Sequence, residues 1–142
     1  MPGSISTLRV LAVDDDAMLR TLLGELLSID GHHADVVETA AEAISLLLSN
    51  SYSILITDYK MPGMTGLELA REVRARGFSL PILLLSSDAG PSLEAAVAQL
   101  GHAGWLAKPF YIDGLRAAIE RLVTAAKLDE SETPRPSGRK GK

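Results

Sequence analysis

Five short apolar runs of strand length alternate with five segments whose apolar residues recur at helical spacing. This alternation limits the fold more strongly than any other feature. Strands that alternate with helices pair in parallel, and the helices then cover both faces of the sheet. We therefore predict an α/β domain with a five-stranded parallel sheet and helices on both faces. The expected strands are 8–13, 34–37, 53–57, 81–85 and 105–107, and the last two helices are expected at about 92–100 and 112–127.

Capping signals and apolar stripes place the first three helices. Thr39 and Thr65 are each followed three residues later by a glutamate, Glu42 and Glu68, which is the pattern of a capping box at a helix start. Gly77 is expected to end the third helix. The apolar residues of the first helix form one stripe at helical spacing: Met18, Leu19, Leu22, Leu23, Leu26 and Leu27. The second helix carries Ala43, Ile44, Leu47 and Leu48, and the last helix is expected to place Leu115, Ala118, Ile119, Leu122 and Val123 inward.

Length and composition indicate one intracellular domain. The 142 residues match the size of a single domain, and the absence of cysteine excludes both a disulfide framework and a thiolate metal site. The N-terminus lacks the pattern of a signal peptide, and no apolar run approaches the roughly 20 residues of a membrane span. We therefore expect a cytoplasmic protein that does not contact the membrane.

The charge is distributed unevenly along the chain. The net charge is −4, although the last nine residues contain four basic residues and no acidic one. The remainder is strongly acidic, so we expect no direct binding of nucleic acid by the folded domain. We divide the chain into an N-terminal extension, 1–6, a folded domain, 7–127, and a disordered basic tail, 128–142.

Charged residues follow three of the expected strands. Asp14, Asp15 and Asp16 come after the first, Asp58 after the third and Lys108 after the fifth. Because the carboxyl ends of parallel strands meet at one edge of the sheet, these side chains should gather there. Clustered carboxylates repel one another unless a cation is present. The pattern therefore predicts a divalent-metal site with a lysine beside it.

Taken together and in this order, these motifs resemble the receiver domain of two-component response regulators. The resemblance covers about 7–125 and implies the flavodoxin-like, (βα)5 arrangement of the chemotaxis regulator CheY. The segments that carry it are Val13-Asp14-Asp15-Asp16, Asp58-Tyr59-Lys60-Met61-Pro62-Gly63, Ser86 and Lys108-Pro109-Phe110.

The resemblance implies that Asp58 accepts a phosphoryl group from a phosphohistidine of a sensor histidine kinase or a phosphotransfer protein. It also implies a Mg²⁺ ion held by Asp15, Asp58 and the backbone carbonyl of Lys60, with Asp14 acting mainly through water. A hard cation suits this oxygen-rich set and offsets the repulsion between the two reacting anions.

Two further residues acquire roles by the same resemblance. Lys108 supplies a second positive charge to the phosphoryl oxygens, and the Ser86 hydroxyl bonds the acyl phosphate once it has formed. The domain would catalyse its own phosphorylation and dephosphorylation without turning over an external substrate, so we do not expect an enzyme.

Some residues depart from the family pattern or have a simpler interpretation. Ser86 stands where threonine is common, and Ser87 where alanine is usual. Trp105 stands at the family's switch aromatic, but an ordinary core residue is an equally good interpretation. Lys60 and Asp88 occupy positions that tune the acyl-phosphate lifetime in the family, and their opposite charges suggest that they pair.

Other charged and titratable residues are expected to be structural. Asp16 is expected to cap the first helix rather than bind metal. His32, His33 and His102 show no metal-ligand spacing and are expected at the surface in turns, which argues against a phosphotransfer role for them.

The resemblance also implies how the signal leaves the domain. The face formed by the fourth helix, fifth strand and fifth helix is expected to rearrange and to bind a downstream effector protein. A phosphorylation-dependent homodimer is a further output that the resemblance allows. An alternative is an interaction module of the same fold that acts without phosphorylation. A haloacid-dehalogenase-like phosphohydrolase would need an acid at position 60, where this chain has Lys60.

Overall fold

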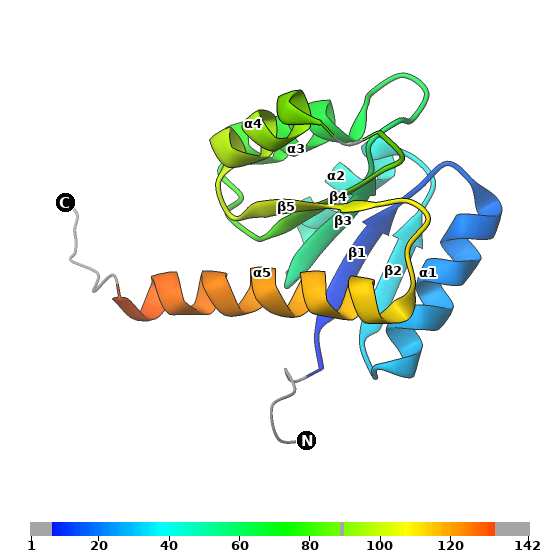
Figure 1. The fold of residues 1–142 in the computed structure, drawn as a ribbon, viewed down its shortest axis with the longest axis horizontal. Helices are drawn as coiled ribbons and strands as arrows, with labels where there is room; N and C mark the ends of the chain where they lie inside the picture. The colour runs from blue at the N-terminus through cyan, green and yellow to red at the C-terminus, as the bar shows by residue number, and fades with distance from the viewer. Residues whose placement is uncertain (1–6, 89, 133–142) are drawn as a thin grey trace.

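The structure is a computed structural model and describes residues 7–88 and 90–132. Strands and helices alternate along the described chain (Figure 1), which confirms the predicted α/β class. The elements are β1 (Arg9–Val13), α1 (Ala17–Ile29), β2 (His33–Val37), α2 (Ala40–Ser49), β3 (Ile54–Asp58), α3 (Gly66–Ala75), β4 (Ile82–Ser86), α4 (Pro91–Leu100), β5 (Ala103–Ala107) and α5 (Ile112–Glu132).

All strand pairs are parallel, and the sheet order is β2-β1-β3-β4-β5. Every residue of β3 and β4 is buried, because both strands are flanked by other strands and covered on both faces. The strand order reverses between β1 and β3, and the helices that follow these strands, α1 and α3, lie on opposite faces of the sheet. In open parallel sheets, ligands bind at the carboxyl ends of the strands at such a point. The fold thus predicts where a ligand site should lie.

Two layers of helices cover the sheet, as expected. On one face, α1 and α5 pack against β1, β3 and β4, with Leu23 and Leu27 of α1 fully buried. On the other face, α2 and α3 pack against the alternate residues of the strands. Beside them, Leu93 and Val97 of α4 form a smaller cluster with Leu84 of β4. The five α5 residues predicted to face the sheet are all buried: Leu115, Ala118, Ile119, Leu122 and Val123.

The predicted helix starts are confirmed at the atomic level. The Asp16 carboxylate accepts hydrogen bonds from the backbone N–H groups of Met18 and Leu19, so it is the N-cap of α1. Thr39 and Thr65 each form the complete capping box with the glutamate three residues later. Gly77 follows the end of α3 with a φ of 94°, a backbone conformation that glycine adopts without strain.

One arginine ties the C-terminal ends of two helices together. The half-buried guanidinium of Arg74, near the end of α3, donates hydrogen bonds of 2.7–3.4 Å to backbone carbonyl groups of three neighbouring segments. Burial lowers the pKa of this guanidinium. The end of α4 and the segments before β4 and β5 are therefore held at one point. The acceptors are the carbonyl oxygens of Phe78, Leu80, Leu100, Gly101 and His102.

Three apolar residues of the first two helices are exposed rather than covered by the sheet. Met18 is 82% exposed, Leu22 37% and Leu48 63%. The apolar stripe of α1 is wider than the strip of helix surface that the sheet covers, and its buried centre lies at Leu23 and Leu27. Helical spacing alone identifies the apolar side of a helix but not how much of that side is covered.

Several strands and α4 are shifted by one residue from the prediction, and two boundaries differ by more. β5 begins at Ala103, two residues before the expected start, because a glycine and an alanine hide the strand pattern. α5 continues to Glu132, so residues 128–132, which we assigned to a disordered tail, are helical. The N-terminal extension, 1–6, and residues 133–142 lie outside the described residues. No helix in the described part of the chain is both long and apolar enough to cross a membrane.

The histidines are only partly as expected. His33 and His102 are exposed. His32 is half-buried instead, and its Nδ1 accepts a 3.1 Å hydrogen bond from the backbone N–H of Leu8. Burial lowers the pKa of His32, which keeps the imidazole neutral and able to accept this bond. The residue connects the end of the α1–β2 turn to the start of β1.

Candidate functional site

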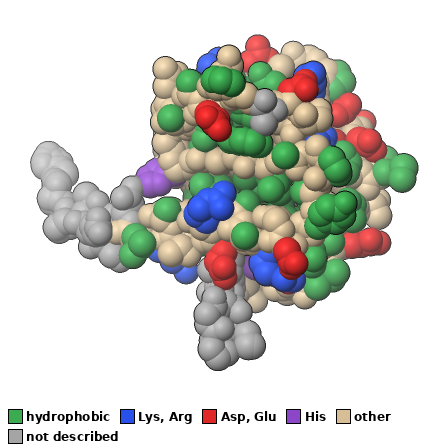
Figure 2. Space-filling model, in the orientation of Figure 1, with side chains coloured by type: hydrophobic (Ala, Val, Ile, Leu, Met, Phe, Trp, Pro, Cys, Tyr) green, Lys and Arg blue, Asp and Glu red, His purple; other side chains and the backbone are tan. Residues whose placement is uncertain are grey.

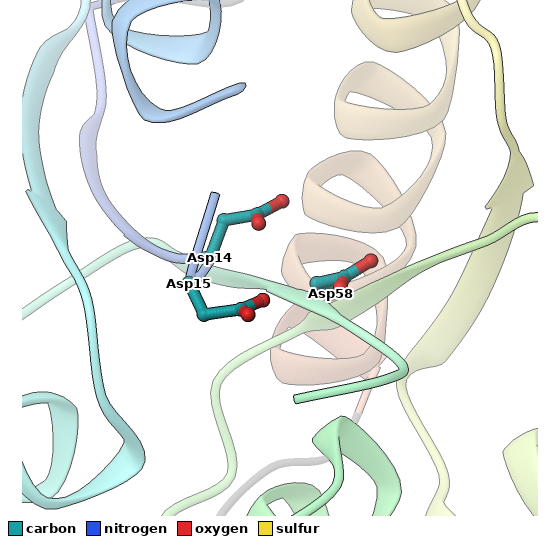
Figure 3. A group of neighbouring side chains, drawn as sticks. All are labelled: Asp14, Asp15 and Asp58. Atoms are coloured by element: carbon teal, nitrogen blue, oxygen red, sulfur yellow. The ribbon is translucent and has the colours of Figure 1, made fainter. Parts of the chain in front are cut away.

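Three carboxylates converge at the carboxyl ends of β1 and β3. Oxygen atoms of Asp14, Asp15 and Asp58 all lie within 4.8 Å of one another, and Figure 3 shows the three side chains pointing into the same space. Asp14 and Asp58 are buried, and Asp15 is exposed. The predicted meeting of these residues at one edge of the sheet is therefore confirmed.

Asp14 lies deepest in this acidic cluster. Its Oδ1 accepts a 2.9 Å hydrogen bond from the backbone N–H of Asp16, while its buried Oδ2 has no hydrogen-bond partner among the described residues. Burial raises the pKa of Asp14, and the nearby Asp58 carboxylate adds to this, whereas the Asp16 N–H opposes it. A buried acceptor without a partner is unfavourable, so this site favours a positively charged ligand.

Lys108 lies beside the cluster, as the sequence predicted. Its Nζ is 2.5 Å from Oδ1 of Asp58, and both side chains are largely buried. The backbone N–H of Lys108 also donates to the carbonyl of Ser86, which continues the pairing of β4 and β5 and fixes where the lysine leaves the sheet. Three acids face one lysine, so the cluster remains short of positive charge.

The residues of the acidic cluster suit a hard divalent cation. The donor set consists of carboxylate oxygens, which such cations prefer, and one of them is buried without a partner. The acidic cluster can therefore hold a metal ion. Lys60 lies two residues after Asp58, and the role of its backbone carbonyl as a ligand stays a prediction.

Ser86, at the end of β4, is 2% exposed and already engaged within its own loop. Its hydroxyl donates a 2.8 Å hydrogen bond to the carbonyl of Asp88 and accepts a 3.1 Å bond from the N–H of the same residue. The hydroxyl must therefore release the Asp88 carbonyl before it can donate to another group. The neighbouring Ser87 is exposed.

An ion pair connects the loops that follow β3 and β4. Lys60 Nζ lies 3.0 Å from Oδ2 of Asp88, and both side chains are exposed. The hydrogen bond to Asp88 raises the pKa of Lys60. The pairing suggested by the opposite charges of these two residues is confirmed.

Trp105 packs against apolar side chains of β4 and α4. The residue is partly buried in β5, where it joins the cluster of Leu84, Leu93 and Val97 beneath α4. This contact agrees with the interpretation of Trp105 as a core residue in the state that the structure represents.

Sequence reasoning missed the importance of Gly66. This buried glycine begins α3, and its N–H donates a 2.7 Å hydrogen bond to the carbonyl of Tyr59. A Cβ atom there would overlap the carbonyl oxygen of Asp58 and lie 2.9 Å from its carbonyl carbon. Only glycine lets α3 approach the backbone of Asp58 so closely. A glycine directly after the Thr65 cap was the available signal.

Sequence reasoning also missed Arg20, in the second turn of α1. Its Nη1 donates a 2.9 Å hydrogen bond to the backbone carbonyl of Asp14, from a partly buried position. Its place six residues after Asp14 on a helix puts it within reach of the strand end, but the sequence does not show which way so long a side chain turns.

Comparison with known proteins identifies what this arrangement is similar to. The sequence profile described as the response regulator receiver domain matches residues 10–120. The response regulator MprA of Mycobacterium ulcerans is 33% identical over 126 residues, which cover 89% of this chain and 54% of that protein. MprA of Mycobacterium leprae is 34% identical over 124 residues, with shares of 87% and 54%. The chain thus spans about half the length of these curated relatives.

Solved structures agree on the fold. The chemotaxis protein CheY4 of Vibrio cholerae superposes with a TM-score of 0.77 and 29% identity, over 82% of this chain and 99% of that one. Full-length FixJ from B. japonicum gives a TM-score of 0.79 at 29% identity, over 89% of this chain and 63% of that one.

Proposed function

The chain belongs to the response regulator receiver domain family, and we propose on this basis that Asp58 accepts a phosphoryl group. The donor would be a phosphohistidine of a sensor histidine kinase or of a phosphotransfer protein. The observation that carries the proposal is the buried Asp58 carboxylate, placed at the end of the central strand β3 between Lys108 and two further acids.

The reaction would form one bond and break one. An Asp58 oxygen attacks phosphorus while the P–N bond of the donor breaks, and its electron pair returns to the imidazole, which takes up a proton. The product is an acyl phosphate on Asp58 and a neutral histidine on the donor. Two anions must approach each other in this step, so positive charge placed in advance lowers the barrier.

We further propose that the cation of the acidic cluster is Mg²⁺. Asp15, Asp58 and the backbone carbonyl of Lys60 would hold it, with Asp14 contributing through water. When bound, it supplies positive charge to the attacking carboxylate and the phosphoryl oxygens. The unpartnered, buried Oδ2 of Asp14 supports a cation in this place.

Lys108 and Ser86 would change partners during the reaction. The Lys108 ammonium, now paired with Asp58, would turn to the phosphoryl oxygens as charge builds up there. Ser86 would exchange its bond to the Asp88 carbonyl for one to a phosphoryl oxygen. Water would later hydrolyse the acyl phosphate. The domain would thus act as a timed switch and not as an enzyme with an external substrate.

We propose that the face formed by α4, β5 and α5 passes the signal to an effector protein. Figure 2 shows hydrophobic side chains along the strip between α4 and α5, where β5 runs in the view of Figure 1. The Ser86 loop leads directly into α4, and Trp105 packs beneath this helix, so a change at Ser86 can reach this face. A phosphorylation-dependent homodimer through the same face is a further possible output.

The proposed function is tested by intact mass after incubation with acetyl phosphate and Mg²⁺. We expect one added phosphoryl group, formed with Mg²⁺ and lost when EDTA replaces it. No adduct at any time, together with no binding of the phosphoryl mimic fluoroberyllate, would favour the interaction module that acts without phosphorylation. Catalytic turnover of a phosphate ester without a stable adduct would favour a phosphohydrolase.

Replacing Lys60 with alanine is expected to speed autodephosphorylation by roughly two- to fivefold. The Lys60–Asp88 pair bridges the loops that follow β3 and β4, and because both side chains are exposed its loss should change the barrier to attack by water only slightly. The measurement is the decay of the phosphorylated mass after the donor has been removed.

Two further variants make this test specific. Asp88→Ala removes the other partner and should give the same increase, and the double variant should show no further one. Arg76→Ala breaks an exposed ion pair with Glu72 on α3 and serves as the control that leaves the decay unchanged. Equal decay rates in the wild type and in both single variants would show that the pair does not shield the acyl phosphate.

A further inference from the structure

The turn between β1 and α1 is fixed at Asp14 by three hydrogen bonds from different parts of the chain. The backbone N–H of Asp14 donates to the carbonyl of Val37 in β2 at 3.1 Å, and its Oδ1 accepts from the N–H of Asp16 at 2.9 Å. Its backbone carbonyl accepts from Nη1 of Arg20 at 2.9 Å. Of these three contacts, the one with Arg20 is made by a side chain from another element.

The Arg20 contact acts on the peptide group between Asp14 and Asp15. This group is planar, so fixing its carbonyl oxygen also fixes the N–H and the Cα of Asp15 on the other side. The direction in which the Asp15 side chain leaves the backbone depends on that plane together with the φ angle of Asp15. Asp15 is the exposed member of the acidic cluster, and its orientation therefore depends on the turn more than on packing.

We propose that Arg20 is a positioning residue for the metal site, and that it acts by orienting the Asp14–Asp15 peptide so that the Asp15 carboxylate faces Asp58. The inference rests on the proposed function, because it takes the acidic cluster to be a Mg²⁺ site. Arg20 donates to a backbone oxygen and does not itself contact the metal or the phosphoryl group.

A positioning role of Arg20 and a purely electrostatic role predict opposite changes in Mg²⁺ affinity when its side chain is removed. Its guanidinium is a cation near a cation site, so if its charge alone mattered, removing it would strengthen Mg²⁺ binding. If it positions Asp15, removing it weakens Mg²⁺ binding, because a free carboxylate must be ordered when the ion binds. The sign of the change therefore separates the two effects.

The experiment is a calorimetric titration with Mg²⁺ alone of the wild type, Arg20→Met, Arg20→Lys and the control Arg121→Met. We expect Arg20→Met to weaken Mg²⁺ binding about two- to tenfold, the range of one net hydrogen bond. Arg20→Lys keeps the charge and one donor and should show a smaller loss. Arg121 is exposed on α5, and its replacement should leave the affinity unchanged.

A second readout distinguishes positioning from general damage. The phosphorylation rate of Arg20→Met with acetyl phosphate should return to at least half of the wild-type rate at saturating Mg²⁺. Unchanged or tighter Mg²⁺ binding in Arg20→Met would overturn the inference, and so would a rate that high Mg²⁺ does not restore. If Arg20→Met does not fold, Arg20→Lys decides by the same two criteria. A wild type that binds no Mg²⁺ would instead refute the proposed function.

Discussion

Replacement of Asp58 by asparagine is expected to abolish phosphorylation, lowering the initial rate with acetyl phosphate by about three orders of magnitude or more. The amide oxygen of asparagine carries no negative charge and does not attack phosphorus, and the amide supplies a poorer metal ligand than a carboxylate. Intact mass should show one phosphoryl group on the wild type and none on the variant.

The Asp58→Asn variant should remain folded, so its loss of phosphorylation would reflect the missing carboxylate and not unfolding of the domain. The substitution removes the ion pair with Lys108 but also relieves the repulsion among the three clustered acids. Asp113→Asn is the matched control, because the Asp113 side chain is 91% exposed and lies on α5. If the Asp58→Asn chain still acquired one phosphoryl group, another acid of the cluster would be the acceptor and the proposed assignment would be wrong.

Replacing Gly66 with alanine is expected to lower the free energy of unfolding by about 2–3 kcal/mol and to slow phosphorylation at the same time. The added Cβ would overlap the carbonyl of Asp58, so either α3 or the end of β3 must move. Movement of β3 displaces Asp58 directly, and movement of α3 shifts the loop that connects Asp58 to this helix. Chemical denaturation measures the stability, and the acetyl phosphate assay measures the rate under conditions where circular dichroism shows the variant folded.

Gly24→Ala is the control for this prediction, since it makes the same chemical change in the interior of α1. A Cβ there would meet only Cγ2 of Val36, at 4.0 Å, which is an ordinary contact. Alanine should therefore stabilise the helix by about 0.5–1 kcal/mol and leave phosphorylation unchanged. If Gly66→Ala behaved like Gly24→Ala, the close approach of α3 to Asp58 would have no importance for the site.

The fold was predictable because several levels of the sequence agree. The apolar runs of β3 and β4 are continuous, as strands covered on both faces require, and the two capping boxes at Thr39 and Thr65 mark where helices begin. The convergence of Asp14, Asp58 and Lys108 was predictable for a topological reason, because each follows a strand of the same parallel sheet.

The remaining features depend on distances between elements that a sequence does not contain. Met18 and Leu48 belong to apolar helix faces, and only the width of the contact with the sheet shows that they are exposed. Gly66 resembles any glycine after a helix cap until the backbone of Asp58 is placed beside it. Arg20 has a long side chain with many rotamers, and its partner is a carbonyl oxygen, which every residue has.

The hydrogen bonds of Arg74 have a mechanical consequence for α4. They fasten the last residue of this helix and the two that follow it, whereas the N-cap residue at its other end is Gly90, which has no side chain to cap the helix. A helix of ten residues is a stiff rod about 15 Å long. We therefore expect a displacement of the loop after Ser86 to move the N-terminal end of α4 more than its C-terminal end, so that the helix would act as a lever hinged at Leu100.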